Sequence, residues 1–194
     1  MMTWLVEILT IAAIVSVTLG CTPLPRVDQS DFCYAKYAFE AEVTDVKQAD
    51  KDSAYEYTIN IKTEYKKDKA AGIYHTVFGD GPMHSCGPQI LNNGTSYMIY
   101  AGDNYNEIEG GLRIDGYKPM DNVNDVDIER MTTKYDCNCT IKFDIDAYFG
   151  YDASGLPPPT NNECNAPVYA CSRSSYCKRN AEGVCTWGNH GECY

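Results

Sequence analysis

Basic side chains are scarce in this sequence of 194 residues. It has 16 Lys and Arg residues against 27 Asp and Glu residues, which gives a formal net charge of −11 at pH 7. Nucleic acids and anionic lipid surfaces attract proteins through clusters of positive charge. The charge balance therefore argues against a nucleic-acid partner and against docking on an anionic membrane.

The sequence also lacks an apolar run long enough to cross a bilayer, which takes about 20 residues. Its longest apolar stretch lies within residues 1–20, where Glu7 interrupts it and the small residues Thr18 and Gly20 follow. We interpret residues 1–20 as a secretory signal peptide cleaved after Gly20. The mature chain then begins at Cys21 with 16 basic and 26 acidic side chains, a net charge of −10, and we expect no membrane insertion.

Motifs of common enzymes are missing too. His75, His84 and His190 are too far apart for a zinc-protease helix, and no nucleophile elbow or phosphate-binding loop occurs. His84 lies two residues before Cys86, which is compatible with thiol catalysis, but a turn histidine beside a disulfide-bonded cysteine is the simpler interpretation. The acidic run 121–129 lacks the ligand spacing and central glycine of a calcium loop, so we expect a solvated helix face. We therefore predict that the protein is not an enzyme and has no cofactor of its own.

Cysteine is absent from the first 20 residues, yet the remainder holds ten cysteines. An even number of cysteines behind a secretory leader predicts a disulfide framework. Asn93-Gly94-Thr95 and Asn138-Cys139-Thr140 are acceptor sequences for N-glycosylation at Asn93 and Asn138. We expect a glycoprotein secreted to the extracellular space or matrix.

Alternating apolar and polar side chains predict short strands with one buried face. The clearest strand spans 55–62, and we expect it to pair with 38–43 across the polar turn 48–53. Three further strands are expected at 72–78, 97–101 and 111–114.

A helix is expected at each end of this series. Residues 28–31 offer capping side chains for a short helix that ends near Tyr37. Residues 121–135 have apolar side chains at helical spacing, with a cap at Asp121 or Asn122. These elements match a mainly-β fold, a five-stranded OB-like Greek-key barrel with flanking helices.

The composition changes at Cys137, because seven of the ten cysteines lie from there onward. A segment this small buries little apolar surface and depends on its bridges, and Pro157-Pro158-Pro159 marks an exposed loop within it. We predict a signal peptide over 1–20, a barrel domain over 21–138 and a small disulfide-rich C-terminal domain over 139–194.

Several cysteine motifs, taken in order, resemble those of the tissue inhibitors of metalloproteinases, which are secreted inhibitors of zinc proteases. The similarity covers nearly all of the mature chain, and it rests on the order and spacing of the motifs together. The motifs are Cys21-Thr22 after the leader, Phe32-Cys33, Ser85-Cys86-Gly87, the Cys137-Asn138-Cys139 junction, Asn162-Glu163-Cys164, and 177–187.

The resemblance implies a netrin-type barrel module and a set of disulfides. The implied pairs are Cys21–Cys86, Cys33–Cys137, Cys139–Cys185 and Cys164–Cys177, which leaves Cys171 to pair with Cys193. One bridge common in the family is absent, because Pro23 occupies the position of one partner and no cysteine lies between Cys86 and Cys137. Pro23 and Pro25 restrict φ in its place.

The resemblance also implies how such a terminus would act. The catalytic zinc of a metalloprotease keeps one position for water, and the α-amine and carbonyl of Cys21 would occupy it as a chelate. Thr22 would enter the primed-side specificity pocket. Pro23, Leu24, Pro25, Ser85 and Cys86 would flank it as one bridged ridge. The zinc is supplied by the partner, a matrix-type zinc metalloprotease, and extracellular matrix is a further expected partner.

Two other functions stay open at this point. A non-inhibitory netrin-type module would bind matrix or a receptor through its surface. A bacterial-type lipoprotein would carry a lipid on Cys21, but Thr18 stands where a leucine is usual and nine other cysteines would remain unevenly paired.

Overall fold

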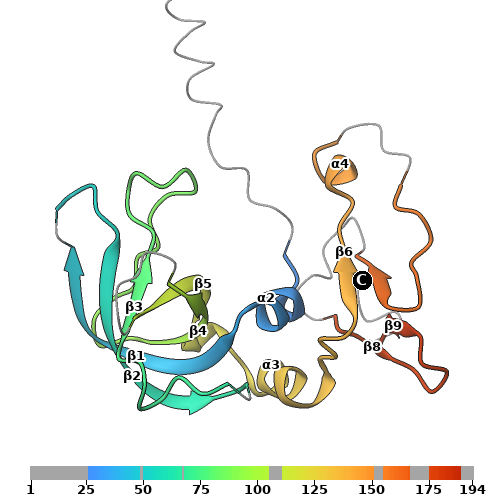
Figure 1. The fold of residues 1–194 in the computed structure, drawn as a ribbon, viewed down its shortest axis with the longest axis horizontal. Helices are drawn as coiled ribbons and strands as arrows, with labels where there is room; N and C mark the ends of the chain where they lie inside the picture. Colours follow the sequence, from blue (N-terminus) through green and yellow to red (C-terminus); the bar gives the residue numbers. More distant parts are fainter. Residues whose placement is uncertain are drawn as a thin grey trace, which may run out of the picture.

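A closed five-stranded β-barrel occupies one side of the molecule, and two small two-stranded sheets lie on the other side (Figure 1). The computed structural model describes residues 26–48, 50–66, 68–104, 111–150, 155–166 and 175–188. The expected mainly-β fold with a five-stranded barrel is confirmed. Helix α2 (Asp28–Tyr34) lies between the barrel and the C-terminal sheets, so the two parts meet at this helix.

The barrel strands follow the expected order along the chain and close in the order β1-β2-β3-β5-β4. All neighbouring pairs are antiparallel except β3 and β5, which run parallel. The predicted third strand begins too early, because residues 71–73 form a turn in which the Tyr74 amide donates to the Ala70 carbonyl. The strands are β1 (Tyr37–Gln48), β2 (Tyr55–Glu64), β3 (Thr76–Gly79), β4 (Ser96–Asp103) and β5 (Gly111–Pro119).

Side chains that alternate along the strands build the barrel core. In β1, Phe39, Ala41 and Val43 are buried inside, while Glu40 and Glu42 between them are only half-buried. Register shifts after Glu40 and Val43 mark bulges, which bend a strand and increase its twist. A short curved sheet of this kind closes on itself, so the barrel has no free strand edge.

Strand β4 is buried on both faces, which explains its continuous apolar sequence. Tyr97 and Ile99 point into the barrel, whereas Met98 and Tyr100 belong to a second cluster outside it. Phe32 of α2 and Met131 of the π-helical segment η2 (Arg130–Lys134) cover this outer face. The flanking helices therefore bury the second face of β4.

Helix α2 begins without the side-chain cap predicted from residues 28–31. Val27 is the N-cap residue and makes no capping hydrogen bond, while Asp28 and Asp31 lie in the first turn, where the helix dipole favours acidic side chains. At the other end, Lys66 reaches from beyond β2 and donates to the carbonyls of Phe32 (2.9 Å) and Ala35. Lys66 thus supplies a C-terminal cap from a distant part of the chain.

The second predicted helix is divided into short pieces. A 3₁₀ turn, η1 (Met120–Asn122), precedes α3 (Asp125–Glu129), and η2 continues it. The cap is Asn124 rather than Asp121 or Asn122, because Asn124 and Asp127 form a reciprocal capping box. The sequence prediction placed the helix start too early.

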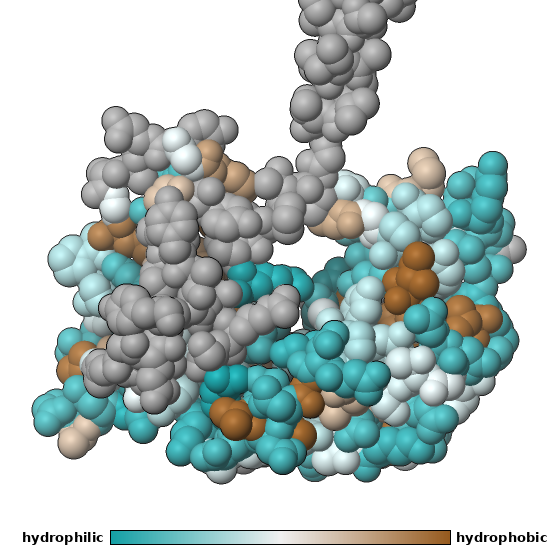
Figure 2. Space-filling model, turned by 180° about the vertical axis from the view of Figure 1, so that it is seen from behind, coloured by the Kyte–Doolittle hydropathy of each residue, from teal (hydrophilic) through white to brown (hydrophobic). Residues whose placement is uncertain are grey.

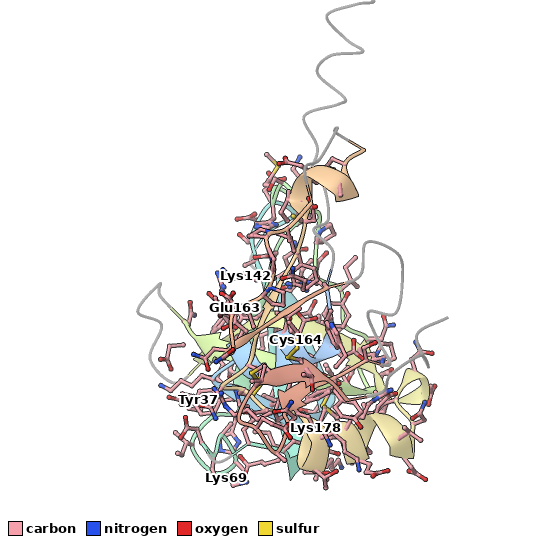
Figure 3. The ribbon with its side chains drawn as sticks, turned by 90° about the vertical axis from the view of Figure 1, so that its right-hand side faces the viewer. Tyr37, Lys69, Lys142, Glu163, Cys164 and Lys178 are labelled. Atoms are coloured by element: carbon pink, nitrogen blue, oxygen red, sulfur yellow. A yellow bond between two sulfur atoms is a disulfide. The ribbon has the colours of Figure 1, made fainter. Side chains whose placement is uncertain are left out.

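The described residues of the C-terminal part form two short strand pairs and one short helix. Strands β6 (Thr140–Lys142) and β7 (Glu163–Asn165) are parallel, and β8 (Cys177–Arg179) and β9 (Cys185–Trp187) are antiparallel. Helix α4 (Ile145–Tyr148) follows β6. Figure 3 looks onto these sheets, where Lys142 and Glu163 form an ion pair at 3.2 Å.

The surface is mostly hydrophilic on the face drawn in Figure 2, with small separate apolar patches. In the part of the chain that the structure describes, no helix is both long and apolar enough to cross a membrane. The large apolar side chains that do lie exposed are spread over several loops and helices.

Candidate functional site

The predicted ridge falls into two segments, of which the structure describes one. Residues Cys21 to Pro25 lie outside the described residues, which begin at Arg26. Ser85 and Cys86 lie in the loop between β3 and β4, and both are exposed. We call residues 80–91 the β3–β4 loop.

Cys86 is disulfide-bonded. The six other cysteines among the described residues pair with one another, so the partner of Cys86 lies outside the described residues. The bond excludes Cys86 as a thiol nucleophile and leaves His84 as the turn histidine expected beside it. The pairings of Cys21 with Cys86 and of Cys171 with Cys193 stay predictions.

The base of the β3–β4 loop is fastened to the barrel. The Gln89 amide donates to the Asp80 carbonyl and the Gln89 side chain accepts from the Asp80 amide, both at 2.9 Å. Tyr57, fully buried in β2, donates from its hydroxyl to the Gln89 carbonyl at 2.6 Å and accepts from the Leu91 amide at 3.1 Å. Burial raises the pKa of Tyr57 to about 12, so this hydroxyl keeps its proton and its donor role.

The loop also packs closely against the turn between β1 and β2. A Cβ added to Gly81 would lie 2.3 Å from the Ser53 carbonyl oxygen, so only glycine allows this contact. Beyond Gly81 the chain makes a tight turn, in which the His84 amide donates to the Gly81 carbonyl and the Gly87 amide to the His84 carbonyl. The Cys86 amide donates to His84 Nδ1 at 3.3 Å, and Asp80 Oδ2 lies 3.4 Å from the same nitrogen.

Two apolar side chains of this loop were not singled out from the sequence. Met83 is 75% exposed and Ile90 is 52% exposed, on either side of Ser85 and Cys86. Single exposed apolar side chains are common on protein surfaces, so these two are noted for their position beside Ser85 and Cys86. The signal in the sequence was an apolar residue on each side of a polar turn, which strand prediction alone does not select.

The start of the described chain is held on strand β5, near the loop base. Arg26 donates from Nη2 to the Asp115 carbonyl at 3.4 Å and pairs with Asp31 at 3.5 Å. The Gln89 side chain donates to the carbonyl of Ile114, the residue before Asp115, at 3.4 Å. The side chains of Arg26 and Gln89 therefore contact the carbonyls of adjacent residues of one strand.

Three carboxyl groups lie around this anchor, and each has a basic partner. Burial raises the pKa of the Asp31 carboxyl, the Arg26 guanidinium opposes that shift, and Asp28 and Asp115 add to it. Arg26 is the counter-charge of Asp31, while Arg113 pairs with Asp115 and Lys118 pairs with Asp28.

The C-terminal part is joined to the barrel through α2. Gln29 is 1% exposed and bonds both backbone groups of Cys177, accepting from its amide at 2.6 Å and donating to its carbonyl at 2.8 Å. Gln29 also donates to the Asp136 carbonyl at 3.2 Å. The Cys33–Cys137 disulfide bonds the same helix to the junction, so α2 is linked to the C-terminal part by both kinds of bond.

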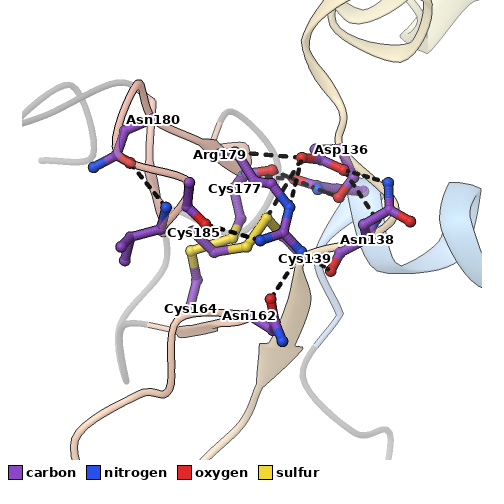
Figure 4. The surroundings of a disulfide bond; sticks show 12 residues. Asp136, Asn138, Cys139, Asn162, Cys164, Cys177, Arg179, Asn180 and Cys185 are labelled. Atoms are coloured by element: carbon purple, nitrogen blue, oxygen red, sulfur yellow. Dashed lines mark hydrogen bonds and ion pairs between the residues drawn. A yellow bond between two sulfur atoms is a disulfide. The ribbon is translucent and has the colours of Figure 1, made fainter.

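Two disulfides pack together at the centre of the C-terminal part (Figure 4). They are Cys139–Cys185 and Cys164–Cys177, the pairs that the family resemblance implies, as Cys33–Cys137 is. Three of their sulfur atoms lie within 4.8 Å of one another, but each is bonded to another cysteine and none is a free thiolate ligand. This cluster is a small covalent core and no metal centre.

Both predicted glycosylation sites lie in exposed turns. Asn93 precedes Gly94, whose φ of 75° suits the turn. The Asn138 side chain donates to Asp136 at 3.1 Å, and its neighbour Cys139 is disulfide-bonded. The use of either site stays a prediction.

A comparison with family models finds one match. Residues 30–116 match the UNC-6/NTR/C345C module. The matched segment runs from helix α2 into strand β5, so it covers most of the barrel and includes Ser85 and Cys86. No curated protein matches the chain. NTR modules are extracellular and non-catalytic, in keeping with the disulfides.

Proposed function

We propose that the protein is a secreted inhibitor of zinc metalloendopeptidases that acts through the mature N-terminus. The amine and carbonyl of Cys21 chelate the catalytic zinc of the protease and displace its water, and Thr22 enters the primed-side pocket. Ser85 and Cys86 contact the protease beside them. The zinc belongs to the partner, and the inhibitor performs no catalysis.

The observation that carries the proposal is the state of Cys86. It lies exposed on a loop fixed by Tyr57 and Gln89, and it is bonded to a cysteine outside the described residues. A disulfide at such a point attaches a second segment to a rigid support. Cys21 is the partner that the family resemblance implies.

The proposed pairing requires the segment before Arg26 to reach Cys86. Arg26 and the loop base are anchored on neighbouring residues of β5. An extended chain spans at most about 3.3–3.6 Å per residue, so the five residues before Arg26 reach up to roughly 17 Å. Pro23 and Pro25 restrict the conformations of that segment. A terminus with few conformations loses little entropy when it binds.

The chemistry of the terminus suits zinc at neutral pH. A free α-amine has a pKa of about 7.7–8.0, so removing its proton near pH 7 costs little free energy. Occupation of the open zinc position removes the water that the protease needs as its nucleophile. Inhibition then follows from simple displacement, with no reaction of the inhibitor.

The test is to add one alanine before Cys21. The extension moves the free amine away from the chelating position and turns the Cys21 nitrogen into an amide. We expect the Ki for matrix-type metalloproteases to rise at least about 100-fold, which is a loss of about 2.7 kcal/mol of binding free energy. The melting temperature should stay unchanged, because the barrel core lies elsewhere.

A comparison of zinc-loaded with zinc-free protease shows whether the extension removes zinc chelation or only other contacts with the protease. The native protein should bind the zinc-loaded protease more tightly than the zinc-free protease, whereas the extended protein should bind the two forms alike. An extended protein that inhibits as well as the native one contradicts the mechanism. Measurement of the intact mass would show in addition whether Cys21 carries a lipid.

A second function is equally compatible with the family match, because an NTR module fits both a metalloprotease inhibitor and a general binding module. A non-inhibitory NTR module would bind matrix or a receptor through its surface. Pro23, in place of the usual second bridge, suits this alternative. It predicts that neither the native nor the extended protein inhibits a metalloprotease while both bind their extracellular partner equally.

A further inference from the structure

One glutamine closes the base of the β3–β4 loop, which is drawn in green beyond β3 in Figure 1. Gln89 lies half-buried between two exposed residues, Pro88 and Ile90. Its side-chain Oε1 accepts from the Asp80 amide, and its backbone amide donates to the Asp80 carbonyl, both at 2.9 Å. These two bonds hold the ends of the loop together, with residues 81–88 between them.

The same glutamine also contacts the barrel on both sides of β3. Its side-chain Nε2 donates to the carbonyl of Ile114 in β5 at 3.4 Å, and Ile114 is 2% exposed. Its backbone carbonyl accepts from the hydroxyl of the buried Tyr57 in β2 at 2.6 Å. Strands β2 and β5 are the two neighbours of β3 in the barrel. Gln89 therefore connects the loop base to both of them.

The chemistry of the side chain suits this position. The Asp80 amide needs an acceptor and the Ile114 carbonyl needs a donor, and a carboxamide offers both on one planar group. A carboxylate only accepts, and a thioether is at most a weak acceptor. Gln89→Glu thus keeps the bond from the Asp80 amide and loses the donor to Ile114, whereas Gln89→Met loses both bonds at a similar side-chain length.

The exposed part of the loop is shaped by its own hydrogen bonds. The His84 amide donates to the Gly81 carbonyl at 3.1 Å and the Gly87 amide to the His84 carbonyl at 2.9 Å, and Cys86 lies in the same turn. The close approach of Gly81 to Ser53 holds one end of this turn against the barrel. Gln89 holds the other end.

We propose that Gln89 is a positioning residue for the protease-binding ridge. It fixes the β3–β4 loop, and with it the segment that is disulfide-bonded to Cys86, in the arrangement that the protease accepts. The kinetic part of this proposal rests on the inhibitory function proposed above. The position of the loop can be measured without a protease.

A positioning role and a direct contact leave different kinetic signatures. If only a fraction of the free inhibitor has the binding arrangement, the affinity falls by that fraction, and association slows because fewer encounters are productive. Loss of a direct contact with the protease acts mainly by faster dissociation. The two rate constants therefore separate the two roles.

The first experiment measures both rate constants for the full secreted protein and a zinc-loaded matrix-type metalloprotease. We expect Gln89→Met to lower the association rate constant at least about fivefold and to leave the dissociation rate constant within about twofold of the native value. Gln89→Glu should lie between Gln89→Met and the native protein. The matched control is Gln48→Met, the same change at a half-buried glutamine that donates to the Ser53 carbonyl at 2.9 Å, and it should bind with native rates.

The second experiment measures hydrogen exchange in the free proteins. In Gln89→Met, the amides of Asp80, His84 and Gly87 should all exchange faster than in the native protein, because the turn loses its fixed base. In Gln89→Glu the Asp80 amide should stay protected, since its acceptor remains. Gln48→Met should leave all three amides unchanged.

Slower association together with faster exchange at His84 and Gly87 supports the proposal. A change confined to the dissociation rate constant would show that Gln89 touches the protease, and it would overturn the positioning role. Faster exchange at Asp80 alone, or equal effects in Gln48→Met, would overturn it as well. If the native protein inhibits no metalloprotease, the proposed function fails, while the exchange data still decide whether Gln89 positions the loop.

Discussion

The barrel and the C-terminal part of the protein are stabilised by different kinds of interaction. The barrel buries a cluster of apolar side chains from all five strands, and no cysteine belongs to that described cluster. The C-terminal part centres on four cysteines, with Ile141 and Trp187 packed against them. A short segment cannot bury enough apolar area to offset its chain entropy, so covalent bonds replace packing there.

The two parts also differ in how their backbone is paired. The barrel closes, so each strand has two neighbours. The C-terminal strands form two pairs of three-residue strands, and isolated pairs of this size are marginal in water. We therefore expect the barrel to tolerate loss of a disulfide and the C-terminal part to tolerate loss of an exposed apolar side chain.

The largest effect should come from Phe39→Ala in the barrel. Phe39 is 1% exposed, and removal of its ring leaves a cavity that costs about 3–5 kcal/mol of unfolding free energy. Phe149→Ala, which makes the same change at a residue 36% exposed after α4, should cost only about 0.5 kcal/mol. Urea unfolding, monitored by tyrosine ellipticity, measures the unfolding free energy of both variants. Equal losses of unfolding free energy would contradict the contrast between the two parts.

The barrel could be predicted from sequence because its signal is local. Strands such as β2 alternate apolar and polar residues, and the turn 48–53 makes β1 and β2 neighbours. The helix caps were less predictable, because Lys66 caps α2 across 31 residues of chain and Asn124 rather than Asp121 begins α3. A partner that distant leaves no periodic pattern.

Some residues of the candidate site could likewise be predicted from the sequence, and others could not. Ser85 and Cys86 could be named from a motif, since a short run of sequence around a cysteine identifies them. The supports of their loop could not, because Tyr57 and Gln89 meet only when β2 and the loop are brought together. Gln29, at the joint between the two parts, depends on contact with Cys177, a residue 148 positions later.

Removal of the Cys164–Cys177 bond tests the C-terminal part. This bond joins residues 13 apart, and closing a loop of that size stabilises a fold by about 3 kcal/mol. In Cys164→Ala/Cys177→Ala the C-terminal sheets should unfold while the barrel persists. Trp187, the single tryptophan after residue 20, donates to the Asn165 carbonyl at 3.0 Å and reports the change by its fluorescence.

The matched variant is Cys33→Ala/Cys137→Ala, which removes a bond between residues 104 apart. Its barrel should lose stability yet remain folded by tyrosine ellipticity, because the apolar core is intact. Native Trp187 fluorescence in the Cys164→Ala/Cys177→Ala variant would show that packing, and not the disulfide, holds the C-terminal part.

The smallest effect concerns acid sensitivity at the junction. Burial alone would raise the pKa of the Asp136 carboxyl, but hydrogen bonds from Asn138 and from the Arg179 amide, with the Arg179 charge, lower it overall. A pKa lowered in the folded state adds stability above the unfolded value of about 3.9. That stability is lost as the pH falls through the lower folded value.

Below about pH 4 the link between Asp136 and β8 should therefore weaken, by less than about 1 kcal/mol because the pair is partly exposed. Hydrogen exchange at the Arg179 amide, 3.4 Å from the Asp136 carboxylate, measures this loss. Asp136→Asn keeps the side-chain size and removes the titration, so its protection of this amide should be lower at neutral pH and nearly independent of acid. If the native protein and the variant lose protection along the same acid curve, the junction is held by Gln29 and the disulfide alone.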